Sequence, residues 1–119
     1  MSVVNVKVAC IRPEYDNLED WMKDPNNEYI GRGGVVFINK IRYPSKSSIW
    51  ANPYKIDKNT CREEVIAKYD VYIRNKLKND VELVEKLQNL KNKKLGCWCY
   101  PEMCHGNVLI QVINEYNLN

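Results

Sequence analysis

Residues 95–108 read LGCWCYPEMCHGNV, and this stretch decides how the C-terminal part of the chain folds. The residues through Cys99 predict a strand, Pro101 predicts a tight turn, and the segment from Cys104 predicts a helix start. This order brings three cysteines close to His105, the one histidine of the chain. We therefore expect the functional centre to lie here.

The spacing inside this stretch gives each side chain a direction. Cys97 and Cys99 are two residues apart, so on a strand they point to one side and Trp98 points to the other. Cys104 and His105 stand at a helix N-terminus, where free N–H groups and the helix dipole favour anions. The same field favours the thiolate form of a cysteine. A strand end followed by a helix start is also where open α/β sheets bind ligands.

Three interpretations of this segment stay open. In the first it lines a pocket for a phosphate, nucleotide or sugar: Cys104 or His105 acts as nucleophile or as acid and base, and Cys99 and Gly106 lie against the ligand. In the second, Cys97 joins Cys99, Cys104 and His105 around a zinc ion, although the C-x-C-x4-C-H spacing is unusual for zinc. In the third, Cys97 and Cys99 are small core residues and His105 makes a hydrogen bond that caps the helix.

Two loops supply further candidate ligand-binding residues. The turn at 31–34 reads GRGG and can place Arg32 and bare backbone N–H groups around a phosphate, or it is a plain turn. The segment 50–54 reads WANPY, and its aromatic rings and amide suit a base or sugar, or they pin the loop to the core. We predict Arg32, Trp50 and Asn52 as ligand contacts.

Strand and helix patterns alternate along the chain, which predicts one α/β domain over residues 1–119. We expect a short, mostly parallel sheet with about three to four helices packed on it. The predicted strands lie at 3–9, at 35–38 (a buried strand) and at 94–99, and residues 41–59 predict an irregular loop. The predicted helices begin after Asn17, at a capping box formed by Thr60 and Glu63, after Asn79 or Asp80, and at about Cys104.

Composition sets broad limits on the function. Five cysteines without a recognisable secretion signal indicate a reducing compartment, and we expect a cytoplasmic protein. No apolar run approaches the roughly 20 residues that cross a bilayer, so we expect no membrane contact. The net charge of +3 is unevenly spread. Residues 14–28 hold six acidic residues and one lysine, whereas residues 40–58 hold five basic residues and one aspartate. Either one side of the molecule attracts phosphate, or these are two solvated loops that partly neutralise each other.

The order of these motifs resembles the uncharacterised family called domain of unknown function 4326, over about residues 3–115. The more distant family 488 has a similar Cys-His-Arg helix start, in which Gly106 here replaces the arginine. The acidic stretch 14–28 and Ala51 depart from the commoner pattern. Members occur in bacteria, phages and large DNA viruses, and no activity is implied. The resemblance rests on YIGR at 29–32, NPY at 52–54, REE at 62–64, LGCWC at 95–99 with Pro101, and CHG at 104–106. The resemblance implies that six residues are important for function and lie close together in the fold: Arg32, Asn52, Cys97, Cys99, Cys104 and His105.

Our prediction is that the domain binds a phosphate-bearing ligand, a nucleotide or a nucleic-acid fragment. If it is an enzyme, we expect hydrolysis or group transfer, with Cys104 or His105 carrying the chemistry and Arg32 holding the anion. The alternatives are a non-enzymatic zinc-binding module and an interaction domain with structural cysteines. The sequence leaves the cofactor and the oligomeric state open.

Overall fold

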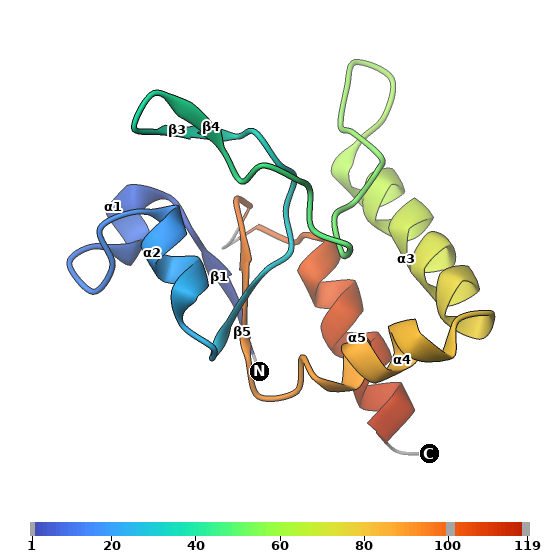
Figure 1. Cartoon of the computed structure of the whole chain (residues 1–119). Helices are drawn as coiled ribbons and strands as arrows, with labels where there is room; N and C mark the ends of the chain where they lie inside the picture. Colours follow the sequence, from blue (N-terminus) through green and yellow to red (C-terminus); the bar gives the residue numbers. More distant parts are fainter. Residues whose placement is uncertain (1, 100–101, 118–119) are drawn as a thin grey trace.

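Three short parallel strands form the centre of the fold (Figure 1). In this computed structural model, which describes residues 2–99 and 102–117, β5 (Lys94–Cys97) lies between β1 (Ser2–Asn5) and β2 (Asn27–Tyr29). The register pairs Gly96 of β5 with Val4 on one side and with Tyr29 on the other. All three strands run in the same direction, so their carboxyl ends meet at one edge of the sheet.

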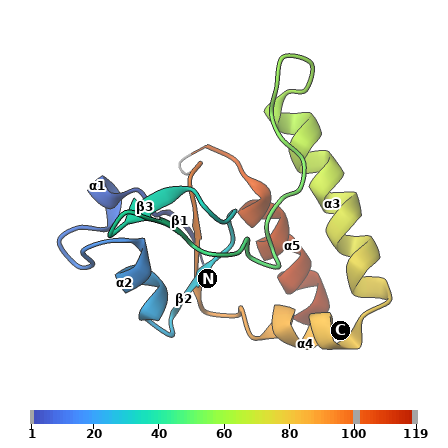
Figure 2. The same ribbon diagram turned by 45° about the horizontal axis from the view of Figure 1, so that its top comes forward.

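Helices cover the two faces of this sheet (Figures 1 and 2). On one face lie the short helices α1 (Val8–Ile11) and α2 (Leu18–Lys23). On the other face lie α3 (Arg62–Lys78), α4 (Val81–Gln88) and α5 (His105–Asn117). The predicted α/β class and the mostly parallel sheet are thus confirmed, with five helices among the described residues.

The alternation of side chains along β5 divides the core in two. Leu95 and Cys97 belong to the cluster beneath α3, α4 and α5. The opposite face of the strand presents Gly96, against which Trp21 of α2 packs, and Trp98 extends this second cluster just beyond the strand. The predicted opposite directions of Cys97 and Trp98 are therefore confirmed.

The local patterns locate the helices well. The side chain of Asn17 accepts a hydrogen bond from the backbone N–H of Asp20 and caps α2, and Asp80 caps α4 through Leu83 in the same way. The apolar stripe of α3 is buried at Val65, Tyr69, Ile73 and Leu77. No helix in the described part of the chain combines the length and apolar character that a membrane crossing needs.

Two predicted strands are wrong in extent or burial. The first ends at Asn5, because the chain turns into α1. The apolar run near residue 36 is not a buried strand but forms β3 (Val36–Ile38), which pairs with β4 (Ile41–Tyr43) in an antiparallel hairpin. Its two-residue turn has positive φ angles, which suits a tight hairpin. Phe37 on β3 is 64% exposed, since the hairpin projects from the sheet (Figure 1).

The predicted capping box at Thr60 is also wrong. Cys61 precedes the first residue of α3 and makes no side-chain capping bond. Thr60 instead pairs with Asp57 in an isolated antiparallel bridge, which closes the loop before the helix. The predicted turn at Pro101 lies outside the described residues.

Candidate functional site

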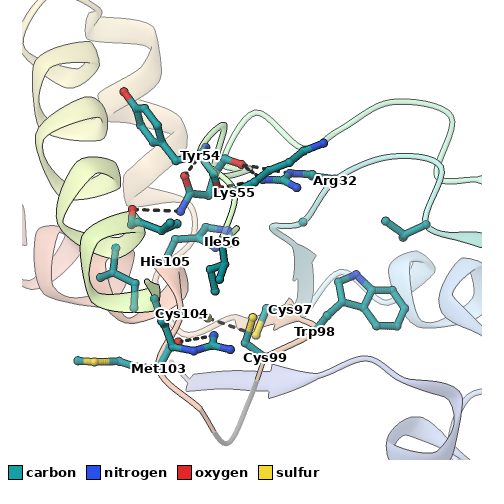
Figure 3. A pocket seen from close by; sticks show the side chains of 16 residues that line it. Arg32, Tyr54, Lys55, Ile56, Cys97, Trp98, Cys99, Met103, Cys104 and His105 are labelled. Atoms are coloured by element: carbon teal, nitrogen blue, oxygen red, sulfur yellow. Dashed lines mark hydrogen bonds between the residues drawn. The ribbon is translucent and has the colours of Figure 1, made fainter. Parts of the chain in front are cut away.

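A cavity of about 360 Å³ opens at the carboxyl edge of the parallel sheet (Figure 3). Its lining comes from the segments that follow β2 and β5, from the loop before α3, and from the first turns of α3 and α5. Open parallel sheets bind ligands at this edge because strand ends and helix N-termini meet there. The fold therefore places a pocket of ligand size at the position that α/β proteins use for binding.

A chain of hydrogen bonds joins the segment after β2 to the segment after β5. The indole Nε1–H of Trp98 donates to the hydroxyl of Tyr29 at 2.9 Å, and that hydroxyl donates to the carbonyl of Arg32 at 2.6 Å. Gly31 permits this arrangement, since a Cβ there would lie 2.5 Å from the Tyr29 oxygen. The YIGR and CWC motifs thus hold each other in place beside the cavity.

Arg32 fastens the loop that carries the NPY motif. Its Nη2 donates to the carbonyl oxygens of Asn52 at 2.9 Å and Tyr54 at 3.0 Å, and its Nε donates to Asn52 at 3.3 Å. The buried side chain of Asn52 accepts from the N–H of Tyr54 and donates to the carbonyl of Val65 in α3. These bonds occupy Nε and Nη2 of Arg32, which leaves Nη1 as the atom for an anion in the cavity.

The ring of His105 is held in one tautomer. Its Nε2 lies 2.7 Å from the carbonyl oxygen of Ile30, and a carbonyl only accepts, so Nε2 carries the proton. The ring also meets the buried Tyr69 edge to face, with centroids 5.0 Å apart. Burial lowers the pKa of His105, and the charge of Arg32 lowers it further. The ring is therefore neutral near pH 7, with a lone pair on Nδ1.

This burial makes the stability of the protein depend on pH in one direction. In the unfolded chain His105 takes up a proton at the ordinary histidine pKa of about 6.5. In the folded chain it takes up this proton only at lower pH, because its pKa is lowered. The unfolded state then binds more protons, so the free energy of unfolding falls as pH drops from 7 towards 5. Urea unfolding at a series of pH values measures this slope.

The variant His105→Gln serves as the control for this slope. Its amide can still donate to Ile30 but does not titrate, so we expect a flatter profile over the same range. The carboxylates with lowered pKa values, at Asp24, Asp57 and Glu63, lose their contribution only at more acidic pH. An unchanged slope in the glutamine variant would assign the effect to other groups.

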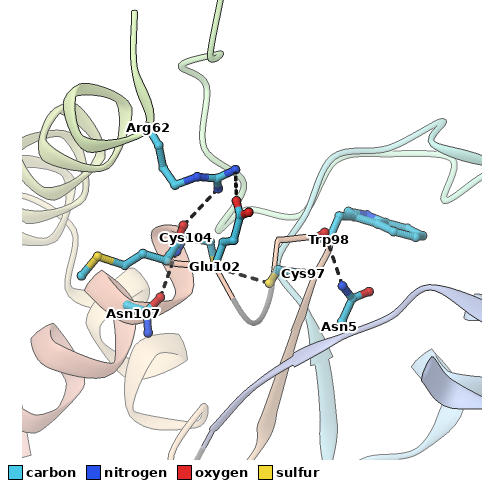
Figure 4. A network of polar contacts seen from close by, with 8 residues as sticks. Asn5, Arg62, Cys97, Trp98, Glu102, Cys104 and Asn107 are labelled. Atoms are coloured by element: carbon cyan, nitrogen blue, oxygen red, sulfur yellow. Dashed lines mark hydrogen bonds and ion pairs between the residues drawn. The ribbon is translucent and has the colours of Figure 1, made fainter. Parts of the chain in front are cut away.

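Cys104 precedes the first residue of α5, and Figure 4 shows its contacts with Cys97 and Asn107. The sulfur of Cys104 caps the helix. It accepts from the backbone N–H of Gly106 at 3.3 Å, while the side chain of Asn107 accepts from the N–H of Cys104 at 2.9 Å. This is the reciprocal pattern of a capping box, with a thiol in place of a hydroxyl. The Cys104 thiol also donates to the sulfur of Cys97 at 3.3 Å. That bond and burial raise the pKa of Cys104, against the effect expected at a helix N-terminus.

Cys99 differs from the other two sulfurs in the cavity. Cys97 and Cys104 are 2% and 3% exposed, whereas Cys99 is half-buried and lines the cavity beside Arg62. Its hydrogen bond with the guanidinium is the first cause of the raised pKa of Arg62. Arg62 also donates to the carbonyl of Met103 and pairs with the exposed Glu102 at 2.7 Å, which ties α3 to the segment before α5.

The described residues around the cysteines do not form a metal-binding cluster. No three His, Cys, Asp or Glu side chains of the described part are placed to share an ion. Nε2 of His105 donates a hydrogen bond to a backbone carbonyl, and the thiol of Cys104 donates a hydrogen bond to the sulfur of Cys97. These contacts do not offer the tetrahedral donor set of the predicted zinc interpretation.

Five of the seven predicted site residues converge on this cavity. Two do not line it: Trp50 is buried in the core with its carbonyl bonded to the Tyr69 hydroxyl, and Gly106 packs against Ile30 and Val3. A Cβ on Gly106 would lie 2.9 Å from each of these two side chains. The converging residues are Arg32, Asn52, Cys99, Cys104 and His105.

Sequence reasoning missed two basic residues of the cavity. Neither residue was predicted as a ligand contact: REE at 62–64 entered only through the family resemblance, and Lys55 only as one of the five basic residues of 40–58. The REE motif was the available signal for Arg62, although its neighbours Glu63 and Glu64 are exposed and do not line the cavity. Both residues line the cavity.

Comparisons with known proteins agree with the motifs. Residues 15–115 match the family described as Domain of unknown function (DUF4326). The "Uncharacterized protein R718" of Acanthamoeba polyphaga mimivirus is 37% identical over 102 residues, which cover 76% of this chain and 72% of that protein. No solved structure matches the chain. The match spans every motif that meets at the cavity, and the chain belongs to the DUF4326 family.

Proposed function

We propose that the cavity binds a nucleotide. The observation that carries this proposal is the charge of its lining: Arg32, Lys55 and Arg62 contribute three cations, and no described lining residue is a carboxylate. Glu102 pairs with Arg62 from outside the cavity and is 65% exposed, so it neutralises only part of this charge. Guanidinium groups bind phosphate through paired hydrogen bonds, which makes a phosphate-bearing ligand the best match.

The rest of the lining suits the base and sugar. Val65 and Ile66 of α3 together with Ile56 and Met103 form an apolar wall, and Tyr54 adds an aromatic ring. Apolar walls with a few placed polar groups are the usual composition of small-molecule sites. The side-chain amide of Asn52 is committed to its own loop and to the carbonyl of Val65 in α3, so we assign it the role of shaping the pocket.

A reaction at the bound nucleotide, hydrolysis or group transfer, is the second candidate. The observation that favours it is the neutral ring of His105, whose Nδ1 lone pair can accept a proton from an attacking water or hydroxyl. Cys104 is a less accessible nucleophile, because its sulfur is buried and bonded to Cys97 and Gly106. In this hypothesis His105 acts as the base and Arg32 stabilises charge on the phosphate.

The five thiols also support a location for this activity. All five cysteines are free, including the exposed Cys10 and Cys61. Exposed thiols persist in reducing compartments, which supports a cytoplasmic site of action.

Calorimetric titration with a panel of ligands tests nucleotide binding. The panel holds the mono-, di- and triphosphates of the four ribonucleosides, the four nucleosides, and inorganic phosphate. We expect at least one nucleotide to bind more tightly than its nucleoside and than phosphate, and to raise the melting temperature. Chromatography of the same mixtures detects any product. A panel without binding at millimolar concentration would overturn the proposal and favour an interaction domain with structural cysteines.

Two lysine variants form a matched pair for this test. Lys55→Ala removes a cation that lines the cavity, and Lys86→Ala removes an exposed cation from α4 at the far end of the domain. We expect only the first variant to weaken nucleotide binding. Equal affinities would contradict a role for the charge of the lining.

A further inference from the structure

Two projections flank the mouth of the cavity (Figures 1 and 2). One is the β3–β4 hairpin, and the other is the loop over residues 52–60 that leads into α3. The cavity lies between them, since Val35 at the base of the hairpin and Lys55 and Ile56 of the loop line it together. A ligand longer than one nucleotide would therefore run along these two projections.

Basic side chains are exposed on the two projections. Lys40, Arg42 and Lys46 belong to the hairpin and the segment after it, and Lys55 and Lys58 belong to the loop. Within the described part of the chain, none of these five makes an ion pair, whereas four of the five observed pairs use cations of helices α2 and α3. The two projections thus carry a net positive charge around the cavity, since Asp57 is the one carboxylate among residues 40–58.

Exposed apolar side chains lie among these cations. Phe37 and Ile41 of the hairpin are 64% and 70% exposed, and Tyr54 and Ile56 of the loop are 37% and 50% exposed. The guanidinium of Arg42 lies 4.8 Å from the centre of the Phe37 ring. Proteins that bind single-stranded nucleic acid combine cations that contact the phosphate backbone with aromatic rings on which the bases stack.

We propose that the ligand is a single-stranded nucleic acid that crosses the sheet edge from the hairpin to the loop and places one nucleotide in the cavity. This inference rests on the proposed nucleotide binding. A single strand is favoured over a duplex because the cavity takes a base out of the stack, and unpaired bases can reach the rings of Phe37 and Tyr54.

Fluorescence anisotropy with labelled oligonucleotides of about 12 residues tests the inference, at a length typical of one single-strand site. We expect the protein to bind single-stranded DNA or RNA more tightly than the matching duplex, and separate DNA and RNA probes identify which sugar is preferred. Five phosphate contacts predict a slope of about −3.5 for log affinity against log salt. Equal or tighter binding of the duplex would overturn the inference.

Two triple variants test whether the oligonucleotide binds through the cations of the two projections and not through the overall charge of the protein. Lys40→Gln with Lys46→Gln and Lys58→Gln removes three cations around the cavity mouth without touching its lining. Lys78→Gln with Lys86→Gln and Lys91→Gln removes three exposed cations from the opposite end of the domain. For the first variant we expect the slope of log affinity against log salt to become about two units shallower. Its affinity for the oligonucleotide should fall at least tenfold. The second variant should resemble the wild type in both quantities.

Mononucleotide titration of the same variants distinguishes the two proposals. We expect both triple variants to bind the mononucleotide as the wild type does, because the cavity lining is unchanged. If the two triple variants bind the oligonucleotide equally, the inference is overturned while nucleotide binding in the cavity stands. If the wild type binds no mononucleotide, the proposed function itself fails.

Discussion

Replacing Gly96 with valine is expected to lower the free energy of unfolding by more than about 3 kcal/mol. Gly96 sits in the middle of the central strand, and a Cβ there would lie 2.6 Å from Val6 and 2.8 Å from the Cζ3 atom of the Trp21 ring. Both neighbours are buried at 1% and 2% exposure, so neither can move into solvent without opening the core. Overpacking of this kind typically costs about 1–3 kcal/mol per site and more for a branched side chain. That is a large part of the stability of a small domain.

Urea unfolding of a graded series measures this effect. Gly96→Ala is expected to lower the free energy of unfolding by about 1–3 kcal/mol, and Gly96→Val by more. Ala67→Val makes a similar addition on the exposed side of α3 and is expected to have a small effect.

A double variant tests whether the Trp21 ring is the cause. If the clash is responsible, Gly96→Ala combined with Trp21→Leu loses less stability than the sum of the two single changes. Strictly additive losses would show that the glycine is required for another reason.

Two helix starts were predictable from the sequence. The caps at Asn17 and Asp80 depend only on nearby residues, and the structure has both caps. The Thr60 box failed because Thr60 pairs across the loop with Asp57, a contact that the local pattern does not contain. The hairpin was misjudged because an apolar run of this length is compatible with a buried strand or with an exposed ribbon.

The convergence of the site was predictable, but the task of each residue was not. The motif order marked Arg32 and His105, yet only the fold shows that Arg32 binds two backbone carbonyls and that Ile30 fixes the ring of His105. Trp50 illustrates the reverse error. Its ring was predicted to contact a ligand, and the hydroxyl of Tyr69 instead anchors its backbone in the core. Such assignments depend on partners more than fifteen residues away in sequence.

The variant Arg32→Ala is expected to reduce nucleotide affinity by at least about a hundredfold, which corresponds to about 2.7 kcal/mol. The change removes a cation from the cavity and also releases the carbonyls of Asn52 and Tyr54, so the loop that forms one wall loses its anchor. Hydrogen bonds to charged groups contribute about 1.5–3 kcal/mol each, so loss of the anion contact alone accounts for much of this change. Calorimetric titration with the best ligand of the panel gives the affinity.

Two further arginine variants show which part of Arg32 matters. Arg32→Lys keeps the charge, but a single ammonium cannot hold the two carbonyls and still present a free pair of donors to phosphate, so we expect an intermediate loss of about tenfold. Arg12→Ala is the matched control, because Arg12 is exposed on the far layer and also donates to a backbone carbonyl, that of Asp16 at 3.0 Å. If Arg32→Ala binds the nucleotide as tightly as Arg12→Ala does, then neither the charge of Arg32 nor its bonds to the loop are needed for binding. The phosphate would then be held by Lys55 and Arg62 on the opposite side of the cavity mouth from the hairpin.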